Sequence, residues 1–205
     1  AIVLDVKTGS GAFMKDIDES FLLAKEMVDI GISMNRSTIA LVTDMNQPLG
    51  YAIGNALEVK EALQLIKGEG PEDLKSICIT LGSYMLLLAN KVSSEYEGKL
   101  MIQQAIESGE ALRTFAKFIK QQGGDIAFIN NPDLLPRAKE VIPYKSSKSG
   151  FIHKIEADVV GVSALTLGAG RDTKDSKIDL SVGIVLNKKV GDFIEKGETL
   201  AYIHC

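Results

Sequence analysis

The stretch from Ile2 to Gly11, which reads IVLDVKTGSG, decides the fold class of this 205-residue chain. Its apolar run ends in a glycine loop, which is typical of a buried parallel strand that leads into a helix. Asp16 stands three residues before Glu19, which predicts the N-terminal cap of a helix that runs to about Met34. The β-branched run from Thr38 to Thr43 predicts a second strand. Strand, helix and strand in this order predict an α/β fold with a parallel sheet.

The middle of the chain has the spacing of amphipathic helices. Ala56, Val59, Leu63 and Ile66 fall on one face, and helices are also expected around residues 72–81, 97–108 and 110–121. Only two strands are evident before residue 140, which is too few for a covered parallel sheet of usual size. We therefore expect the sheet to be completed elsewhere or to be missing in part. Because the chain starts inside an apolar run without Met, we expect a fragment or a processed chain.

The texture changes after residue 140. Short apolar runs separated by turns predict strands at residues 150–155, 159–165, 182–186 and 200–203, and hence a small barrel or sandwich. We expect an incomplete α/β domain with a parallel or mixed sheet over residues 1–140. A truncated all-β domain is expected over residues 141–205, which makes the chain α+β overall. Residues 190–201 resemble biotinyl and lipoyl carrier domains, which implies a barrel-sandwich shape, although the lysine motif of those carriers is missing.

Charge, apolar run length and the few Cys and His residues argue against several classes of function. The formal charge is −4 and no dense run of Lys and Arg occurs, which argues against nucleic acid as a partner. The apolar runs are too short to span a bilayer, so no membrane partner is expected. Two distant cysteines favour a reduced, cytoplasmic setting. The two histidines, in predicted strands and without a nucleophile elbow, give little support to hydrolytic or zinc chemistry.

Three loops have residues that could bind a ligand, but a purely structural role also explains each of them. The loop Thr8–Gly11 could hold an anion at a helix start, yet an ordinary turn between strand and helix is favoured. The run Gly168–Arg171 resembles a phosphate-binding turn, but a hairpin or loop turn is expected. The run Asp44–Gly50 follows a strand, and its Pro and Gly leave carbonyls free for a hard cation. On the residues alone, Glu58 and Glu61 of the next helix are solvated side chains.

Three sets of runs together resemble the pyrimidine-nucleoside and thymidine phosphorylases. They are DVKTGSGAFM at residues 5–14, TDMNQPLG at 43–50 with GNALEV at 54–59, and LGAGR at 167–171 with ID, VGI and VGD between residues 178 and 192. The resemblance implies a pentosyltransferase of nucleoside salvage, cytoplasmic and homodimeric. Its members cleave uridine, thymidine or deoxyuridine with phosphate, releasing the base and a pentose 1-phosphate.

The same resemblance implies few site residues in this chain. The family's phosphate loop, Lys-His-Ser-Thr-Gly-Gly, and the segment that holds the pyrimidine are absent, so we expect no catalytic residue here and no activity from the chain alone. The resemblance implies a potassium ion held by the carbonyls of Leu49 and Ala52 and the carboxylate of Glu61. It also implies that Phe13 lines the pyrimidine pocket. The alternatives are a carrier module and a relative of anthranilate phosphoribosyltransferase, against which residues 151–205 argue.

Overall fold

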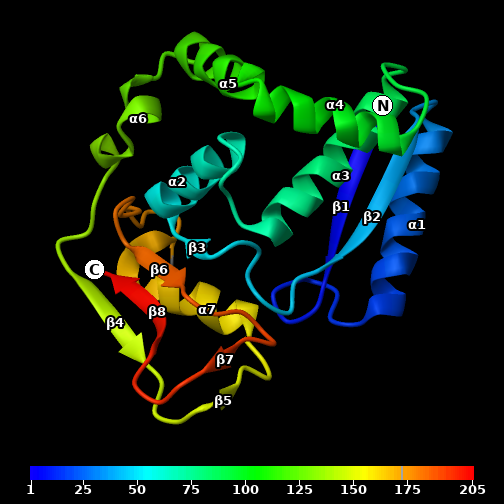
Figure 1. Cartoon of the computed structure of the whole chain (residues 1–205). Helices are drawn as coiled ribbons and strands as arrows, with labels where there is room; N and C mark the ends of the chain where they lie inside the picture. The colour runs from blue at the N-terminus through cyan, green and yellow to red at the C-terminus, as the bar shows by residue number, and fades with distance from the viewer. Residues whose placement is uncertain (172) are drawn as a thin grey trace.

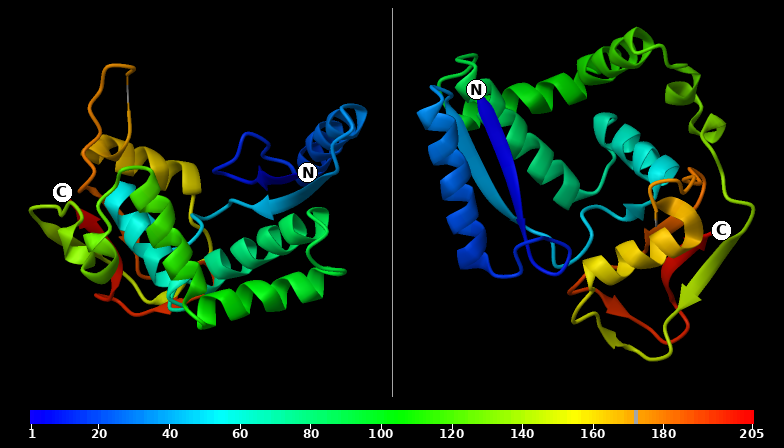
Figure 2. Two further views of the ribbon diagram at one scale, coloured as in Figure 1. Left: turned by 90° about the horizontal axis from the view of Figure 1, so that it is seen from above. Right: turned by 180° about the vertical axis from the view of Figure 1, so that it is seen from behind.

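A parallel strand pair with helices on both faces forms the N-terminal part of the molecule. The computed structural model describes residues 1–171 and 173–205. Strand β1 (Ile2–Thr8) pairs in parallel with β2 (Thr38–Asp44), and α1 (Ile17–Ser33) connects them. Helix α1 packs on one face of this pair and α3 (Glu72–Leu88) contacts the other face (Figures 1 and 2). The predicted βαβ unit is confirmed, and within the described residues this sheet has two strands.

Local chemistry explains where α1 begins. The carboxylate oxygen Oδ1 of Asp16 accepts hydrogen bonds from the backbone N–H groups of Asp18 at 2.8 Å and Glu19 at 3.2 Å. These two acidic residues also stand in the first turn, where the helix dipole favours negative charge. The predicted cap at Asp16 is therefore confirmed, and it satisfies two of the N–H groups that a helix start leaves free.

A run of helices connects the two halves of the chain. The four predicted helices are confirmed as α2 (Asn55–Ile66), α3, α4 (Glu95–Glu107) and α5 (Glu110–Gln121). The short helix α6 (Ala127–Asn130) and the 3-10 turn η1 (Pro132–Leu134) then lead around to the C-terminal strands (Figure 1). In the described ranges, no helix combines the length and the apolar character that crossing a membrane requires.

Antiparallel strands dominate the C-terminal region. A four-stranded sheet has the order β3-β6-β8-β4, and β5 pairs with β7. Their bounds are β3 Ala52–Ile53, β4 Val141–Lys145, β5 Gly150–Phe151, β6 Gly183–Leu186, β7 Phe193–Ile194 and β8 Thr199–His204. These strands form no closed barrel within the part of the chain that the structure describes.

The expected strand at residues 159–165 is wrong. Residues Ala157–Ala164 form helix α7, and Leu165–Ala169 continue it as the π-helical turn η2. Ala157 and Ala164 are buried and Val160 packs on the core between them, a helical spacing that is hard to recognise in a short and mostly apolar run. The region after residue 140 is therefore mixed rather than all-β.

Of the two structures expected at Gly168–Arg171, a hairpin or a loop turn, the hairpin is wrong. Gly168 and Ala169 lie in the last turn of η2, and the positive φ of 104° at Gly168 interrupts the helical conformation there. Such a φ suits glycine, which ends many helices. The run is therefore a helix terminus.

Strand β3 joins the two halves of the molecule. Although it lies early in the chain, Ala52 and Ile53 pair with Val185 and Ile184 of β6. The close approach depends on Gly183, because a Cβ atom there would stand 2.1 Å from the carbonyl oxygen of Ile53. One cluster of buried residues packs together in the C-terminal region; its members are Ala164, Ile184, Leu186 and Ala201.

Candidate functional site

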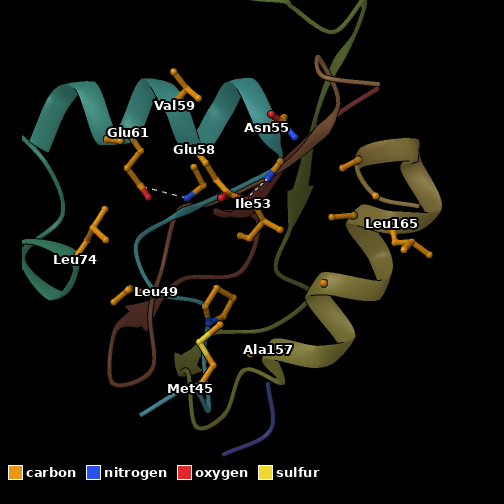
Figure 3. Close-up of a pocket in the computed structure, with 18 residues that line it drawn as sticks. Met45, Leu49, Ile53, Asn55, Glu58, Val59, Glu61, Leu74, Ala157 and Leu165 are labelled. Atoms are coloured by element: carbon orange, nitrogen blue, oxygen red, sulfur yellow. Dashed lines mark hydrogen bonds between the residues drawn. The ribbon is translucent and has the colours of Figure 1, made fainter. Parts of the chain in front are cut away.

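A cavity of about 760 Å³ lies between α2, the segment that follows β2, and α7 with η2 (Figure 3). This volume falls in the range of small-molecule pockets. Leu49, Ala52 and Glu61, the three predicted potassium ligands, all line it. The structure therefore brings these three residues, which come from a loop, a strand and a helix, to one wall.

Glu61 is the buried carboxylate of the site. It lies on α2 one turn after the buried Leu57, so the helix carries it on its inner face, and only 7% of the residue is exposed. Its oxygen Oε1 accepts from the backbone N–H groups of Tyr51 at 2.8 Å and Ala52 at 3.1 Å. Burial raises the pKa of Glu61, and these two N–H groups offset part of that rise. The carboxylate thus fixes the backbone that enters β3.

Gly50 makes room for the second oxygen of this carboxylate. A Cβ atom at Gly50 would stand 2.1 Å from Oε2 of Glu61, and the φ of Gly50 is 68°. Both the close contact and the left-handed backbone exclude a larger residue. The sequence feature Pro48-Leu49-Gly50 is therefore a turn shaped around a carboxylate.

Glu58, one turn before Glu61, has a different role. It is exposed, and its Oε1 accepts from the backbone N–H of Gly54 at 3.0 Å. Gly54 is the N-cap of α2, so Glu58 satisfies a backbone group at the helix start. Glu58 is therefore exposed, as a solvated side chain would be, but it also holds a backbone group and lines the cavity.

An ion pair next to the turn Pro48-Leu49-Gly50 was not predicted from the sequence. The ammonium of Lys189 lies 2.9 Å from Oδ2 of Asp73, and it also donates a hydrogen bond to the carbonyl of Pro48. Although burial acts in the opposite direction, Lys189 and two backbone N–H groups hold the pKa of Asp73 below its ordinary value. Lys189 stands beside the Val190-Gly191 turn in the sequence. A lysine next to a turn does not by itself indicate a buried ion pair.

The backbone N–H groups of the glycine loop after β1 donate hydrogen bonds to other parts of the protein. The N–H of Ser10 donates to Oδ1 of Asn46 at 3.2 Å, and that of Gly11 donates to the carbonyl of Met45 at 2.9 Å. The hydroxyl of Ser10 in turn accepts from the N–H of Ala157 at 3.0 Å. Because Asp16 already caps α1 with a carboxylate, the geometry supports a structural turn over an anion site.

Phe13 stands apart from the cavity. It lies in the bend after the glycine loop, it is 99% exposed, and it is not among the described residues that line the cavity. A ring so exposed is available to a ligand or to another polypeptide segment.

The charge of the cavity wall limits its chemistry. Two carboxylates, Glu58 and Glu61, line it, while the described lining includes neither Lys nor Arg. A wall of this kind repels phosphate, and it suits a cation with oxygen ligands. In the described part of the chain, no cluster of three or more His, Cys, Asp or Glu side chains is placed to hold a metal, so such an ion would need backbone carbonyls.

Two protein families match this architecture. Residues 1–112 match the family described as "Glycosyl transferase family, a/b domain", and residues 151–205 match "Pyrimidine nucleoside phosphorylase C-terminal domain". By these matches, the chain consists of a glycosyl transferase α/β domain and a smaller C-terminal domain.

Similar proteins narrow this class. The chain is 55% identical over 204 residues to a pyrimidine-nucleoside phosphorylase of Geobacillus stearothermophilus. It is 53% and 52% identical to proteins of the same description from Staphylococcus aureus and Staphylococcus haemolyticus. Each match covers 100% of this chain and 47% of the relative. The chain belongs to the pyrimidine-nucleoside phosphorylase family, and it spans about half the length of these relatives.

Proposed function

We propose that this chain is part of an enzyme that cleaves pyrimidine nucleosides with phosphate. The observation that carries the proposal is the identity of 55% over the whole chain to the Geobacillus stearothermophilus phosphorylase. In the proposed reaction, a phosphate oxygen bonds to C1′ of the sugar, the bond from C1′ to the base breaks, and the base leaves. The substrates would be uridine, thymidine or deoxyuridine.

The chain by itself should be inactive. Positive groups must hold the phosphate and the negative charge that develops on the leaving base. The cavity offers carboxylates instead, and the N–H groups of Ser10 and Gly11 are already bonded within the protein. We therefore assign no catalytic residue to this chain, and its proposed role is to complete and support the site.

A potassium ion on the cavity wall is the second part of the proposal. The donors would be the carbonyl oxygens of Leu49 and Ala52 and the carboxylate of Glu61, an all-oxygen set that suits a hard cation. Three observations support the fit of these residues to a potassium ion. All three residues line the same cavity, Glu61 is little exposed, and its Oε1 is held by backbone N–H groups. A bound cation would offset the cost of a buried carboxylate and order the loop around Leu49.

Further features of the whole protein are also proposals. Phe13 would line the pyrimidine pocket, which its exposure permits. The whole protein would act in the cytoplasm as a homodimer. Its C-terminal strands would belong to a barrel-sandwich of the biotinyl and lipoyl type, with α7 as an additional helix. The matches across residues 1–112 and 151–205 favour the phosphorylase over a carrier module or an anthranilate phosphoribosyltransferase relative.

A chimera tests the activity. This chain would replace the matched stretch of the Geobacillus stearothermophilus relative, and uracil release from uridine and phosphate would be measured for the chimera and for the chain alone. We expect turnover only from the chimera. A folded but inactive chimera would contradict the proposed function, and robust turnover by the 205-residue chain would contradict the assignment of catalytic groups to other parts of the protein.

The potassium site is tested separately in the same chimera. Glu61→Ala should abolish the dependence of turnover on potassium, whereas Glu58→Ala, which removes the other carboxylate that lines the cavity, should preserve it. If the two variants respond to potassium alike, Glu61 is not a ligand.

A further inference from the structure

One side chain of the C-terminal region reaches into the loop that carries Leu49. The ammonium of Lys189 lies 2.9 Å from Oδ2 of Asp73 and donates to the carbonyl of Pro48. It also lies 5.3 Å from the centre of the Tyr51 ring. The Lys189 side chain is only 12% exposed. The Asp73 side chain is 39% exposed, so the ion pair is shielded from water on the lysine side and partly solvated on the carboxylate side.

The ion pair holds the loop on both sides of Leu49. Oδ2 of Asp73 accepts from the N–H of Gly50 at 3.1 Å, in addition to its contact with Lys189. Pro48 is thus fixed through its carbonyl and Gly50 through its N–H, so the peptide units that flank Leu49 have little freedom. Beyond Gly50, Glu61 fixes the N–H groups of Tyr51 and Ala52.

The turn that carries Lys189 is itself anchored. The N–H of Lys189 donates to Oδ2 of Asp192 at 2.7 Å, and the N–H of Val190 donates to Oε1 of Gln47 at 3.0 Å. Gln47 lies directly before Pro48, so the loop and the turn are joined at two successive points. The position of the ammonium is therefore set by the backbone and does not depend on the lysine side chain alone.

We infer that Lys189, paired with Asp73, is a positioning residue that aims the carbonyl of Leu49 at the proposed cation. The inference rests on the proposed function, because the cation is part of that proposal. Groups that hold metal ligands in place have measurable effects, and their loss typically weakens metal affinity about 10- to 100-fold. Lys189 is not among the described residues that line the cavity, and its contribution is the geometry of the loop.

The first experiment needs only the 205-residue chain. Amide hydrogen exchange measured by NMR should show faster exchange at Gly50 in Lys189→Met and in Asp73→Asn than in the unmodified chain. Lys188→Met is the matched control, because Lys188 contacts Phe193 and Glu198 within its own region. Unchanged exchange at Gly50 in both test variants would overturn the inference.

The second experiment uses the chimera. The potassium concentration for half-maximal turnover should rise about 10-fold or more in Lys189→Met, while KM for uridine at saturating potassium stays the same. The double variant Asp73→Asn/Lys189→Met should lose less than the sum of the two single variants, because both changes remove the shared ion pair. A shift no larger than that of Lys188→Met would overturn the positioning role alone. A chimera without any potassium dependence would overturn the proposed cation site, and this role with it.

Discussion

Two substitutions of Glu61 should separate the effect of its hydrogen bonds on stability from the effect of its charge. In Glu61→Ala, the N–H of the buried Ala52 loses its partner, which costs about 1–3 kcal/mol. The N–H of the half-buried Tyr51 can partly regain water, so it adds at most about 1 kcal/mol. Relief of a buried charge acts in the opposite direction. We expect a net loss of about 1–3 kcal/mol in the free energy of unfolding, a large part of the 5–15 kcal/mol typical of a domain.

Glu61→Gln should behave differently. It keeps a carbonyl oxygen for the same two N–H groups but carries no charge. Burial raises the pKa of Glu61, so the folded chain holds that proton more tightly than the unfolded chain. This contribution to stability is complete below the unfolded pKa and is lost as pH rises through the folded pKa. The glutamine variant should therefore gain stability relative to the unmodified chain as pH rises above the unfolded pKa of about 4.3.

Urea unfolding in potassium-free buffer measures both effects. Glu58→Ala is the comparison, because it removes one hydrogen bond between a carboxylate of the same helix and a backbone N–H, that of Gly54. If Glu61→Ala loses no more stability than Glu58→Ala, the two hydrogen bonds to Tyr51 and Ala52 contribute no more than the single bond to Gly54. If the difference between Glu61→Gln and the unmodified chain stays constant with pH, the carboxylate is solvated and the reasoning is refuted.

Four further measurements probe the fold. Gly50→Ala should lower the melting temperature more than Gly191→Ala, because both have a positive φ but only Gly50 faces a carboxylate within 2.1 Å of the added Cβ. Leu63→Ala, at a residue 2% exposed, should cost about 2–5 kcal/mol in urea unfolding. Asp16→Ala should cost about 1 kcal/mol and reduce helical circular dichroism. Burial lowers the pKa of His204, so stability should be complete above pH ~6.5 and fall below it; His204→Asn should remove this dependence.

Local signals made the first strand, helix and strand predictable. The cap at Asp16 and the apolar periodicity of α1 act within a few residues, so neither needs the rest of the fold. The run Ala157–Ala164 lacked such a signal, because a short and mostly apolar stretch suits both a buried strand and a buried helix. Its packing against β6 and β3 decides in favour of a helix, and that packing is set by residues elsewhere in the chain.

The candidate site was predictable only in part. Leu49, Ala52 and Glu61 came from family resemblance, since the spacing alone favoured a solvated Glu61. A carboxylate one turn after Leu57 on the apolar face of a helix was a usable physical signal, because a buried charge needs partners. Asp73 and Lys189 could not be found this way. Their pairing exists only once β3 and β6 have brought the two regions together.

The contacts that shape the site cross the boundary expected at residue 140. Strand β3 pairs with β6, the hydroxyl of Ser10 accepts from the N–H of Ala157, and Lys189 pairs with Asp73. The three contacts differ in kind, yet all of them anchor the segment between β2 and α2 or the loop beside it. A disturbance in the C-terminal region therefore has a direct physical route to the backbone around Leu49. The C-terminal region should for this reason influence the cation site even though it supplies none of the proposed ligands.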